Sequence, residues 1–247
     1  MTRRIVGFDR KIEREWLDYA AAQASEGLSS QDMRSRLWDF LDSRVSAGSS
    51  GWNSDRGKVI TVLMRIWGPG EGRYERLRQG AVAALGGASP QSRIALHWAL
   101  CLGSYPFFAD VARATGQHLA LHGEAQLSEV RRRLVEGWGD RAVTRRATQR
   151  ILRSMIDWGV LEDGPSRGVY VSGPVQPVSE PALGELLVMG LLLAQDGEAI
   201  PAEKLRSHPA VFPFQVEQDV LALGQGASLV RLEREALGSR YLRLAGG

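Results

Sequence analysis

Apolar residues near the start of the chain recur at three- and four-residue spacing, which is the period of a helix with one buried face. The clearest sets are Ile12, Trp16, Tyr19 and Ala20, then Met33, Leu37, Phe40 and Leu41, and then Val59, Val62, Leu63 and Ile66. Segments rich in Gly, Ser and Pro separate them. Asn53 or Ser54 is a suitable cap for one helix, and Ser89 before Pro90 for another. The pattern predicts an all-helical N-terminal domain over residues 1–104.

From Tyr105 three helix-length segments precede a β-like pattern. They are PFFADVARATGQHLALHG, then LSEVRRRLVEGWG with Ser128 as its expected cap, and then DRAVTRRATQRILRSMIDWG. VLED and VYV follow as strand patterns around the turn-forming segment GPSRG. Three helices followed by a hairpin is the order of a winged helix-turn-helix, which we predict over residues 105–173.

The C-terminal part, residues 174–247, repeats this order more faintly after a linker, SGPVQPVSEP. We expect helices over 181–195, about 202–207 and 214–223, and strands in LVRLERE and RYLRL. The expected third helix carries Gln215, Glu217, Gln218 and Asp219, whose acids would repel phosphates. The whole chain is therefore predicted to be mainly α, a helical bundle followed by two winged helix-turn-helix-like domains with small β-hairpins, the second degenerate and structural or protein-binding.

Positive charge is concentrated in the middle segment. The formal net charge of the chain is +3, and eight Arg face three acids between Gln126 and Arg153, so the rest of the chain is net −2. A solvated helix face normally interleaves both signs, whereas this one is mostly Arg. Arginine forks onto phosphate, which favours DNA as the partner.

The third predicted helix of the middle domain has one apolar and one basic face. Val143, Ala147, Ile151 and Met155 repeat every four residues and should pack inward. The expected DNA-binding residues are Arg141, Thr144, Arg145, Arg146, Gln149, Arg150 and Arg153, joined by Arg167 in the hairpin loop. Base-reading amides are few among them, so we expect duplex DNA to be bound with little sequence preference.

Several segments also resemble a known family. They are RGKVITVLMRIW, ALHWALCLGSYPFFADVARATGQHLALHGE, RRRLVEGWGDR, QRILRSMIDWGVL and HPAVFPF. In sequence texture they are similar to BrxA, the small helical protein of BREX phage-defence operons. The resemblance implies a cytoplasmic, non-enzymatic, DNA-binding accessory component that works with other BREX proteins, among them a methyltransferase and an ATPase.

Enzymatic and metal-dependent functions find little support in the sequence. His118 and His122 are four residues apart, as in zinc proteases, but HLALH has Leu where the general-base Glu would stand. His97 and Cys101 lie in an apolar run and are expected to be buried core residues. We therefore expect no catalytic residue, no metal and no cofactor.

A membrane span is also not expected, because the apolar run Leu183 to Ala194 is shorter than the ~20 residues a bilayer needs. The single cysteine of the chain suits a reducing cytoplasm. Two classes of function remain open. One is a DNA-binding component of phage defence, with a winged-helix transcription regulator as its near neighbour. The other is a protein-interaction scaffold within the defence complex.

Overall fold

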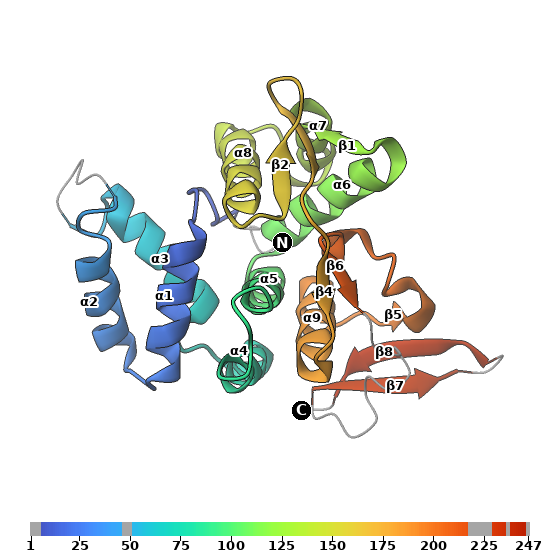
Figure 1. Ribbon diagram of the computed structural model, residues 1–247, viewed down its shortest axis with the longest axis horizontal. Coiled ribbons are helices and arrows are strands. Elements are labelled where there is room, and N and C mark those ends of the chain that lie inside the picture. Colours follow the sequence, from blue (N-terminus) through green and yellow to red (C-terminus); the bar gives the residue numbers. More distant parts are fainter. Residues whose placement is uncertain (1–5, 46–50, 217–228, 236–237, 246–247) are drawn as a thin grey trace.

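Helices dominate the computed structural model of the chain, which describes residues 6–45, 51–216, 229–235 and 238–245 (Figure 1). The helices are α1 (Arg14–Ser25), α2 (Ser30–Phe40), α3 (Asp55–Trp67), α4 (Gly72–Leu85), α5 (Arg93–Ser104), α6 (Pro106–His122), α7 (Leu127–Trp138), α8 (Ala142–Asp157) and α9 (Pro181–Ala194). The strands are β1 (Glu124–Gln126), β2 (Leu161–Asp163), β3 (Val169–Ser172), β4 (Gln176–Val178), β5 (Ile200–Pro201), β6 (Phe214–Val216), β7 (Val230–Arg234) and β8 (Arg240–Leu244). The predicted mainly α class is confirmed.

The N-terminal helices bury the apolar sets that predicted them. Trp16, Leu37 and Leu63, from α1, α2 and α3, are all buried in the core. Ser54 caps α3 as expected, since its Oγ accepts a hydrogen bond from the Gly57 amide at 3.1 Å. The prediction for α5 was wrong by one turn. Ser89 Oγ accepts from the amide of Ser92 at 3.1 Å, but residues 90–92 form a turn and the helix itself begins at Arg93.

Two apolar helices lie at the centre of the molecule. Helix α5 is buried along its whole middle, and α9 packs directly against it. The crossing is so close that a Cβ on Gly190 would lie 2.4 Å from the carbonyl oxygen of Ala99, which explains a glycine inside α9. Trp98 on α5 also donates a hydrogen bond from Nε1 to the Ala210 carbonyl at 2.9 Å. One hydrophobic core therefore runs from the N-terminal helices to the C-terminal segment.

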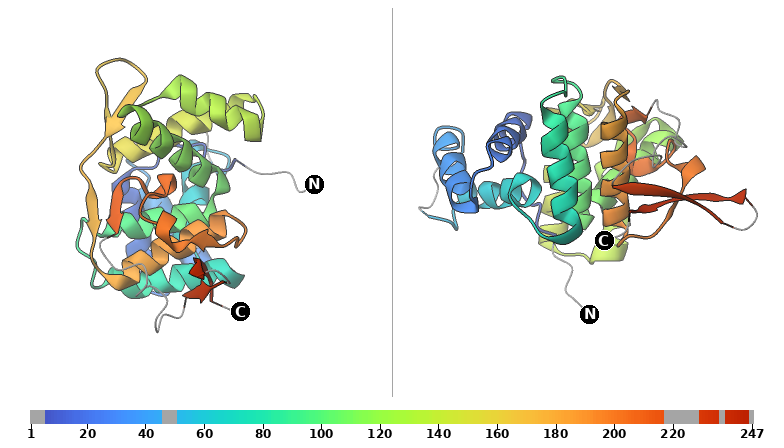
Figure 2. Two further views of the ribbon diagram at one scale, coloured as in Figure 1. Left: turned by 90° about the vertical axis from the view of Figure 1, so that its right-hand side faces the viewer. Right: turned by 90° about the horizontal axis from the view of Figure 1, so that it is seen from below.

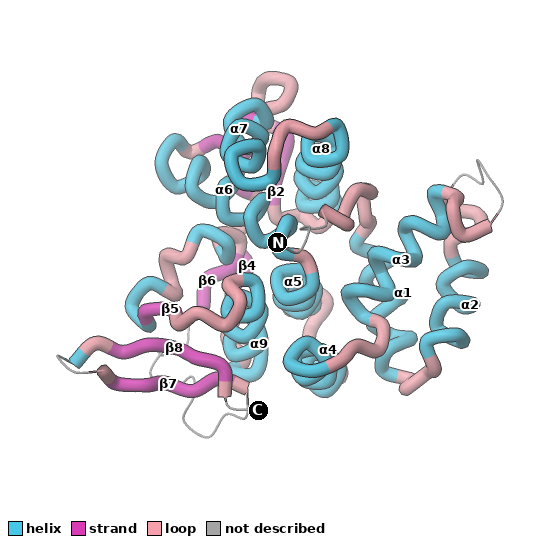
Figure 3. The backbone as a smooth tube through the Cα atoms, turned by 180° about the vertical axis from the view of Figure 1, so that it is seen from behind, coloured by secondary structure: helices cyan, strands magenta, loops and turns pink. Residues whose placement is uncertain are grey.

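The described strands form three small sheets, which Figure 3 shows in magenta among the helices. The first is antiparallel with the order β1-β3-β2, so the hairpin predicted over residues 160–171 is confirmed, with strands at 161–163 and 169–172, and gains a third strand. The second pairs β4 with β6 in parallel. The third has the order β5-β8-β7 and contains the predicted C-terminal hairpin, which projects from the body (Figure 2).

The C-terminal segment departs from prediction in three places. The helix expected from Phe214 is wrong at its start, because Phe214–Val216 is a strand with alternating burial whose Phe214 ring packs edge-on against Trp98. Its partner β4 lies inside the expected linker. The short helix expected at 202–207 is a 3-10 turn over Ala202–Lys204. Residues 217–228, which include the acidic Glu217 and Asp219 and the neutral Gln218 of the expected helix, lie outside the described residues.

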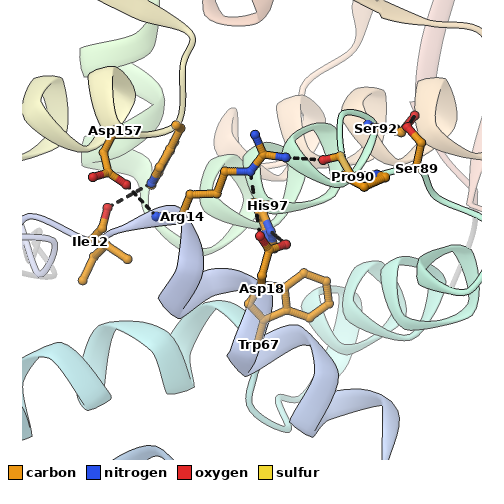
Figure 4. Close-up of polar contacts among 10 residues, drawn as sticks. Ile12, Arg14, Asp18, Trp67, Ser89, Pro90, Ser92, His97 and Asp157 are labelled. Carbon is orange, nitrogen blue, oxygen red and sulfur yellow. Dashed lines mark hydrogen bonds and ion pairs between the residues drawn. The ribbon is translucent and has the colours of Figure 1, made fainter. Parts of the chain in front are cut away.

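Polar contacts tie the start of α1 to the end of α8, as Figure 4 shows. The Arg14 amide donates to Asp157 Oδ1 at 2.8 Å, and Trp158 Nε1 donates to the Ile12 carbonyl at 2.9 Å. The Arg14 guanidinium reaches the carbonyl of Pro90, in front of α5. The basic helix of the middle segment is thus anchored at its C-terminal end to the N-terminal helices.

His97 is a buried junction between α1, α3 and α5 (Figure 4). Trp67 Nε1 donates a hydrogen bond to His97 Nδ1 at 3.1 Å, so the proton of the neutral ring lies on Nε2, which is 3.1 Å from Asp18 Oδ1. Burial lowers the pKa of His97, although the Asp18 carboxylate opposes this shift. The predicted core role of His97 is confirmed, and so is the burial of Cys101.

Among the described residues no individual helix has both the length and the apolar character of a membrane span. Helices α5 and α6 reach that size only when taken together, and they meet at an angle of 118°. The domain boundaries predicted after residues 104 and 173 fall in connections between elements, and they stay predictions.

Candidate nucleic-acid interface

Helices α7 and α8 are joined by a tight turn. Gly139 follows the last residue of α7 and has φ 79°, a left-handed conformation that costs glycine little. Trp138 fixes the end of α7, because its Nε1 donates to Asp110 Oδ2 at 2.8 Å and its ring stands edge-on to Phe107. Arg141 closes the turn by donating to the Trp138 carbonyl at 3.0 Å, so it is only partly free to contact a ligand.

The buried face of α8 decides which of its side chains point outward. Ala147, Ile151 and Met155 are fully buried, as the four-residue pattern predicted. The exposed residues of the helix then include Arg145, Arg146, Gln149, Arg150 and Arg153. The candidate basic face is therefore on the surface.

Thr144 is the exception among the predicted DNA-binding residues. Its side chain is 1% exposed, and its Oγ1 is buried without a hydrogen-bond partner. Thr144 lies on the same inward stripe of α8 as Ala147 and Ile151. Its place at the start of the helix is what predicted a DNA contact. The expectation that it contacts DNA is corrected by its burial.

Two of the exposed arginines are already paired with acids. Arg153 Nη1 lies 2.7 and 2.8 Å from the two carboxylate oxygens of Asp163 on β2. Arg145 Nε lies 3.3 Å from Asp140 Oδ1 in the turn before α8. Both pairs are exposed to solvent and contribute little to stability. Their main effect is to reduce the positive charge of the surface.

Three other arginines of this surface have no acidic partner among the described residues. Within the described ranges, the guanidinium groups of Arg146, Arg150 and Arg167 make no ion pair and no hydrogen bond, and all three residues are exposed. Arg146 and Arg150 are one turn apart on α8, and Arg167 lies in the loop between β2 and β3. Arg131 on α7 and Arg141 in the turn before α8 also lack an ion pair among the described residues and donate only to neutral acceptors, so the uncompensated charge lies on α7, the turn, α8 and this loop.

Two neighbouring hollows lie along these elements. One hollow of about 520 Å³ is bordered by Arg131 and by the exposed side of α8. A second hollow of about 400 Å³ lies between α8 and the β2–β3 loop. Gln149 and Arg153 line both, so the two hollows are neighbours, and we call them together the α8–loop groove. Figure 1 shows α8 and this hairpin side by side at the top of the molecule.

The β2–β3 loop is held in place by backbone contacts. The amide of Leu127, the first residue of α7, donates to the Gly168 carbonyl at 2.8 Å, and the Gly164 amide donates to the Val169 carbonyl at 2.8 Å. Gly168 has φ 82°, so the turn depends on glycine. These bonds fix the loop that carries Arg167 relative to the helices.

Two charged residues of the groove were not predicted from the sequence. Arg131 reaches over from α7, and its Nη2 donates to Gln149 Oε1 at 3.3 Å. Asp163 brings a carboxylate to the edge of the groove. The run RRR at 131–133 could have pointed to Arg131, because its two neighbours, Arg132 and Arg133, have acids three residues away on the same helix, with which they pair in the structure.

Other candidate chemistry does not assemble in the described part of the chain. The rings of His118 and His122 are 5.8 Å apart on the last turns of α6. Within the described residues no group of three or more His, Cys, Asp or Glu side chains is placed to hold a metal ion. The α8–loop groove therefore remains the candidate site.

Known proteins do not identify the function of this groove. The chain matches no protein-family model, no curated protein and no solved structure.

Proposed function

We propose that the chain is a non-catalytic protein that binds duplex DNA through the α8–loop groove. In this proposal residues 105–173 form a winged helix-turn-helix. The observed order of α6, β1, α7, α8 and the β2–β3 hairpin supports it, as does the three-residue turn between α7 and α8. The β2–β3 loop is then the wing.

The observation that carries the proposal is the set of unpaired arginines along one groove. Arg146, Arg150 and Arg167 have no acidic partner in the described ranges, and they border a depression that a phosphate backbone can enter. A guanidinium forks onto phosphate oxygens and releases counterions when it binds. The three side chains therefore suit a polyanion better than a small neutral ligand.

The groove also explains why the sequence preference should be weak. Gln149 is the amide best placed to read a base edge, but its Oε1 accepts a hydrogen bond from Arg131. Reading adenine requires the amide oxygen and nitrogen together. As long as the Arg131 contact persists, Gln149 offers only its donor side, and phosphate contacts dominate.

The resemblance to the BrxA family supports a place for this binding in BREX phage defence, in the cytoplasm and beside other BREX proteins. The same exposed arginines could instead hold acidic surfaces of partner proteins, as a scaffold would require. A winged-helix transcription regulator would use the same helix with strong preference for one operator.

Fluorescence anisotropy titrations of labelled DNA duplexes distinguish these three functions. Salt-sensitive binding of unrelated duplexes with similar affinity supports the proposal. A preference of a thousandfold or more for one sequence, on the order seen for specific regulators, would favour the transcription regulator. No binding at low salt would leave the scaffold as the better account and overturn the proposal.

A further inference from the structure

An exposed aromatic pocket lies far along the chain from the α8–loop groove, on α2 and the turn before α3. Its volume is about 620 Å³, and it is lined by Ser30, Gln31, Arg34, Ser35 and Trp38 of α2 and by Gly51 and Trp52 of the turn. The α2 residues are three and four positions apart and form a second face of that helix, beside the face that carries the buried Met33 and Leu37. We call this the Trp52 pocket.

The turn holds Trp52 in an exposed position. Its side chain is 56% exposed, in contrast to the buried Trp67, Trp98 and Trp158. The backbone beneath it is fixed, because a Cβ on Gly57 would lie only 2.2 Å from the Trp52 carbonyl oxygen. The Ser54 amide also donates to the Gly51 carbonyl at 3.0 Å. A closely packed backbone thus presents a large apolar ring that is more than half exposed to solvent.

The second ring of the pocket is supported from within the protein. Trp38 lies with its ring centroid 5.2 Å from that of Trp52, at an interplanar angle of 58°. The guanidinium of Arg56 lies 4.8 Å from the centre of the Trp38 ring. Arg56 is itself 6% exposed and forms an ion pair of 2.6 Å with Asp42. Trp38 therefore forms one wall of the pocket and is tilted against Trp52, which lines the same hollow.

The charge of the pocket favours an anionic ligand. Arg34 is the charged side chain of its lining, with its guanidinium 5.9 Å from the centre of the Trp52 ring. No carboxylate in the described part of the chain pairs with it. The remaining polar groups, among them the Gln31 amide and the Ser35 hydroxyl, can exchange hydrogen bonds with a heterocycle.

We propose that the Trp52 pocket binds one unstacked base of single-stranded DNA, with the base against Trp52 and its phosphate on Arg34. Stacking on aromatic rings combined with a cation for the backbone is how proteins hold single strands without reading sequence. Bases inside a duplex are stacked on each other and cannot enter. The pocket is independent of the α8–loop groove, so it adds a second mode of DNA binding to the chain.

The test uses the full chain and a fluorescein-labelled dodecamer of thymidine, with a duplex of equal length beside it. Trp52→Ala should weaken binding of the single strand by between about fivefold and a hundredfold, and leave duplex binding unchanged. Trp52→Phe keeps a ring for stacking and should retain most of the affinity. Arg34→Gln should weaken the single-strand complex and reduce its salt dependence.

Two controls separate the pocket from the groove and from general effects. Leu121→Ala removes another apolar side chain, 75% exposed, and should change nothing. Trp52→Ala should weaken single-strand binding by the same factor in a chain that also lacks the Arg146 and Arg150 side chains. The test of the Trp52 pocket therefore does not depend on whether the α8–loop groove binds DNA. Equal affinity of Trp52→Ala and the parent chain for the single strand overturns the inference. Equal losses for single strand and duplex would also overturn it, as would a Trp52-dependent acidic peptide complex without any effect on DNA.

Discussion

Replacing Arg146 and Arg150 together by Ala should weaken duplex DNA binding and flatten its dependence on salt. Neither guanidinium has a partner in the described ranges, so the change leaves no carboxylate unpaired. Both residues are exposed on α8, and Ala is the best helix former, so the helix should keep its stability. A loss of affinity can then be assigned to lost contacts with DNA.

The size of the effect follows from counterion release. Each phosphate contact contributes about 0.9 to the slope of log affinity against log salt, so the double substitution should lower the slope by about 1.8. At ~0.15 M salt the two contacts together are worth roughly thirtyfold in affinity, if counterion release is their only contribution. Anisotropy titrations of a labelled duplex at several salt concentrations measure both quantities.

A matched control removes the same charge from the neighbouring helix. Arg132 and Arg133 on α7 are exposed, do not line the groove, and pair with Glu129 and Glu136. Their joint replacement by Ala should change the salt slope much less. Equal slopes and affinities for the two double variants would show that net charge alone sets the binding and that Arg146 and Arg150 are not specific contacts.

Three further changes test particular contacts. Asp163→Asn frees Arg153 and removes a negative charge from the groove, so duplex affinity should rise about fivefold with little change in stability, measured by anisotropy and urea unfolding. Thr144→Val removes a buried hydroxyl without a partner, so the free energy of unfolding should rise by roughly 1 kcal/mol while DNA affinity stays the same. Burial lowers the pKa of His97 in the folded chain. In the unfolded chain His97 is protonated as the pH falls below about 6.5, whereas in the folded chain it stays neutral at that pH. The free energy of unfolding should therefore fall as the pH drops from 7 towards the folded pKa. His97→Gln can keep both hydrogen bonds and should reduce this fall in urea-unfolding experiments at pH 7 and pH 5.5.

For each of these three predictions, one result would contradict it. Weaker DNA binding by the Asn variant would mean that the Asp163 carboxylate positions Arg153 productively. A marked loss of DNA affinity in the Val variant would restore Thr144 as a contact residue. Identical pH dependence of stability in the parent chain and the Gln variant would show that His97 is not the group that titrates.

Local patterns were enough to predict most elements, because helix period and hairpin turns are encoded within a few residues. The buried stripe of α8 and the β2–β3 hairpin are examples, confirmed in position. Strand β6 was not predicted, because its conformation depends on contacts with residues distant in sequence. Phe214–Val216 pairs with a segment far away in sequence, and its ring packs on Trp98, so tertiary contacts decide its conformation.

The candidate site was predicted less completely than the fold. Residue type indicated a basic helix, but it could not show that Asp163 and Asp140 lie beside Arg153 and Arg145. Thr144 was assigned by its place along the helix, whereas its angular position around the axis buries it. Charge pairing and helix rotation are both set by packing, which a single sequence does not specify.

Site-directed crosslinking tests the proposed DNA-binding surface most directly. The single cysteine of the chain, Cys101, is buried, so an introduced cysteine can carry a photoreactive probe alone. We would place it at Ala142 or Ser166, both exposed beside the groove and neither an arginine, and at Leu121 on α6 as a control. We expect crosslinks to a duplex from residues 142 and 166 that disappear at high salt, and none from residue 121. Crosslinks from residue 121 without any from 142 or 166 would contradict the proposed DNA-binding surface.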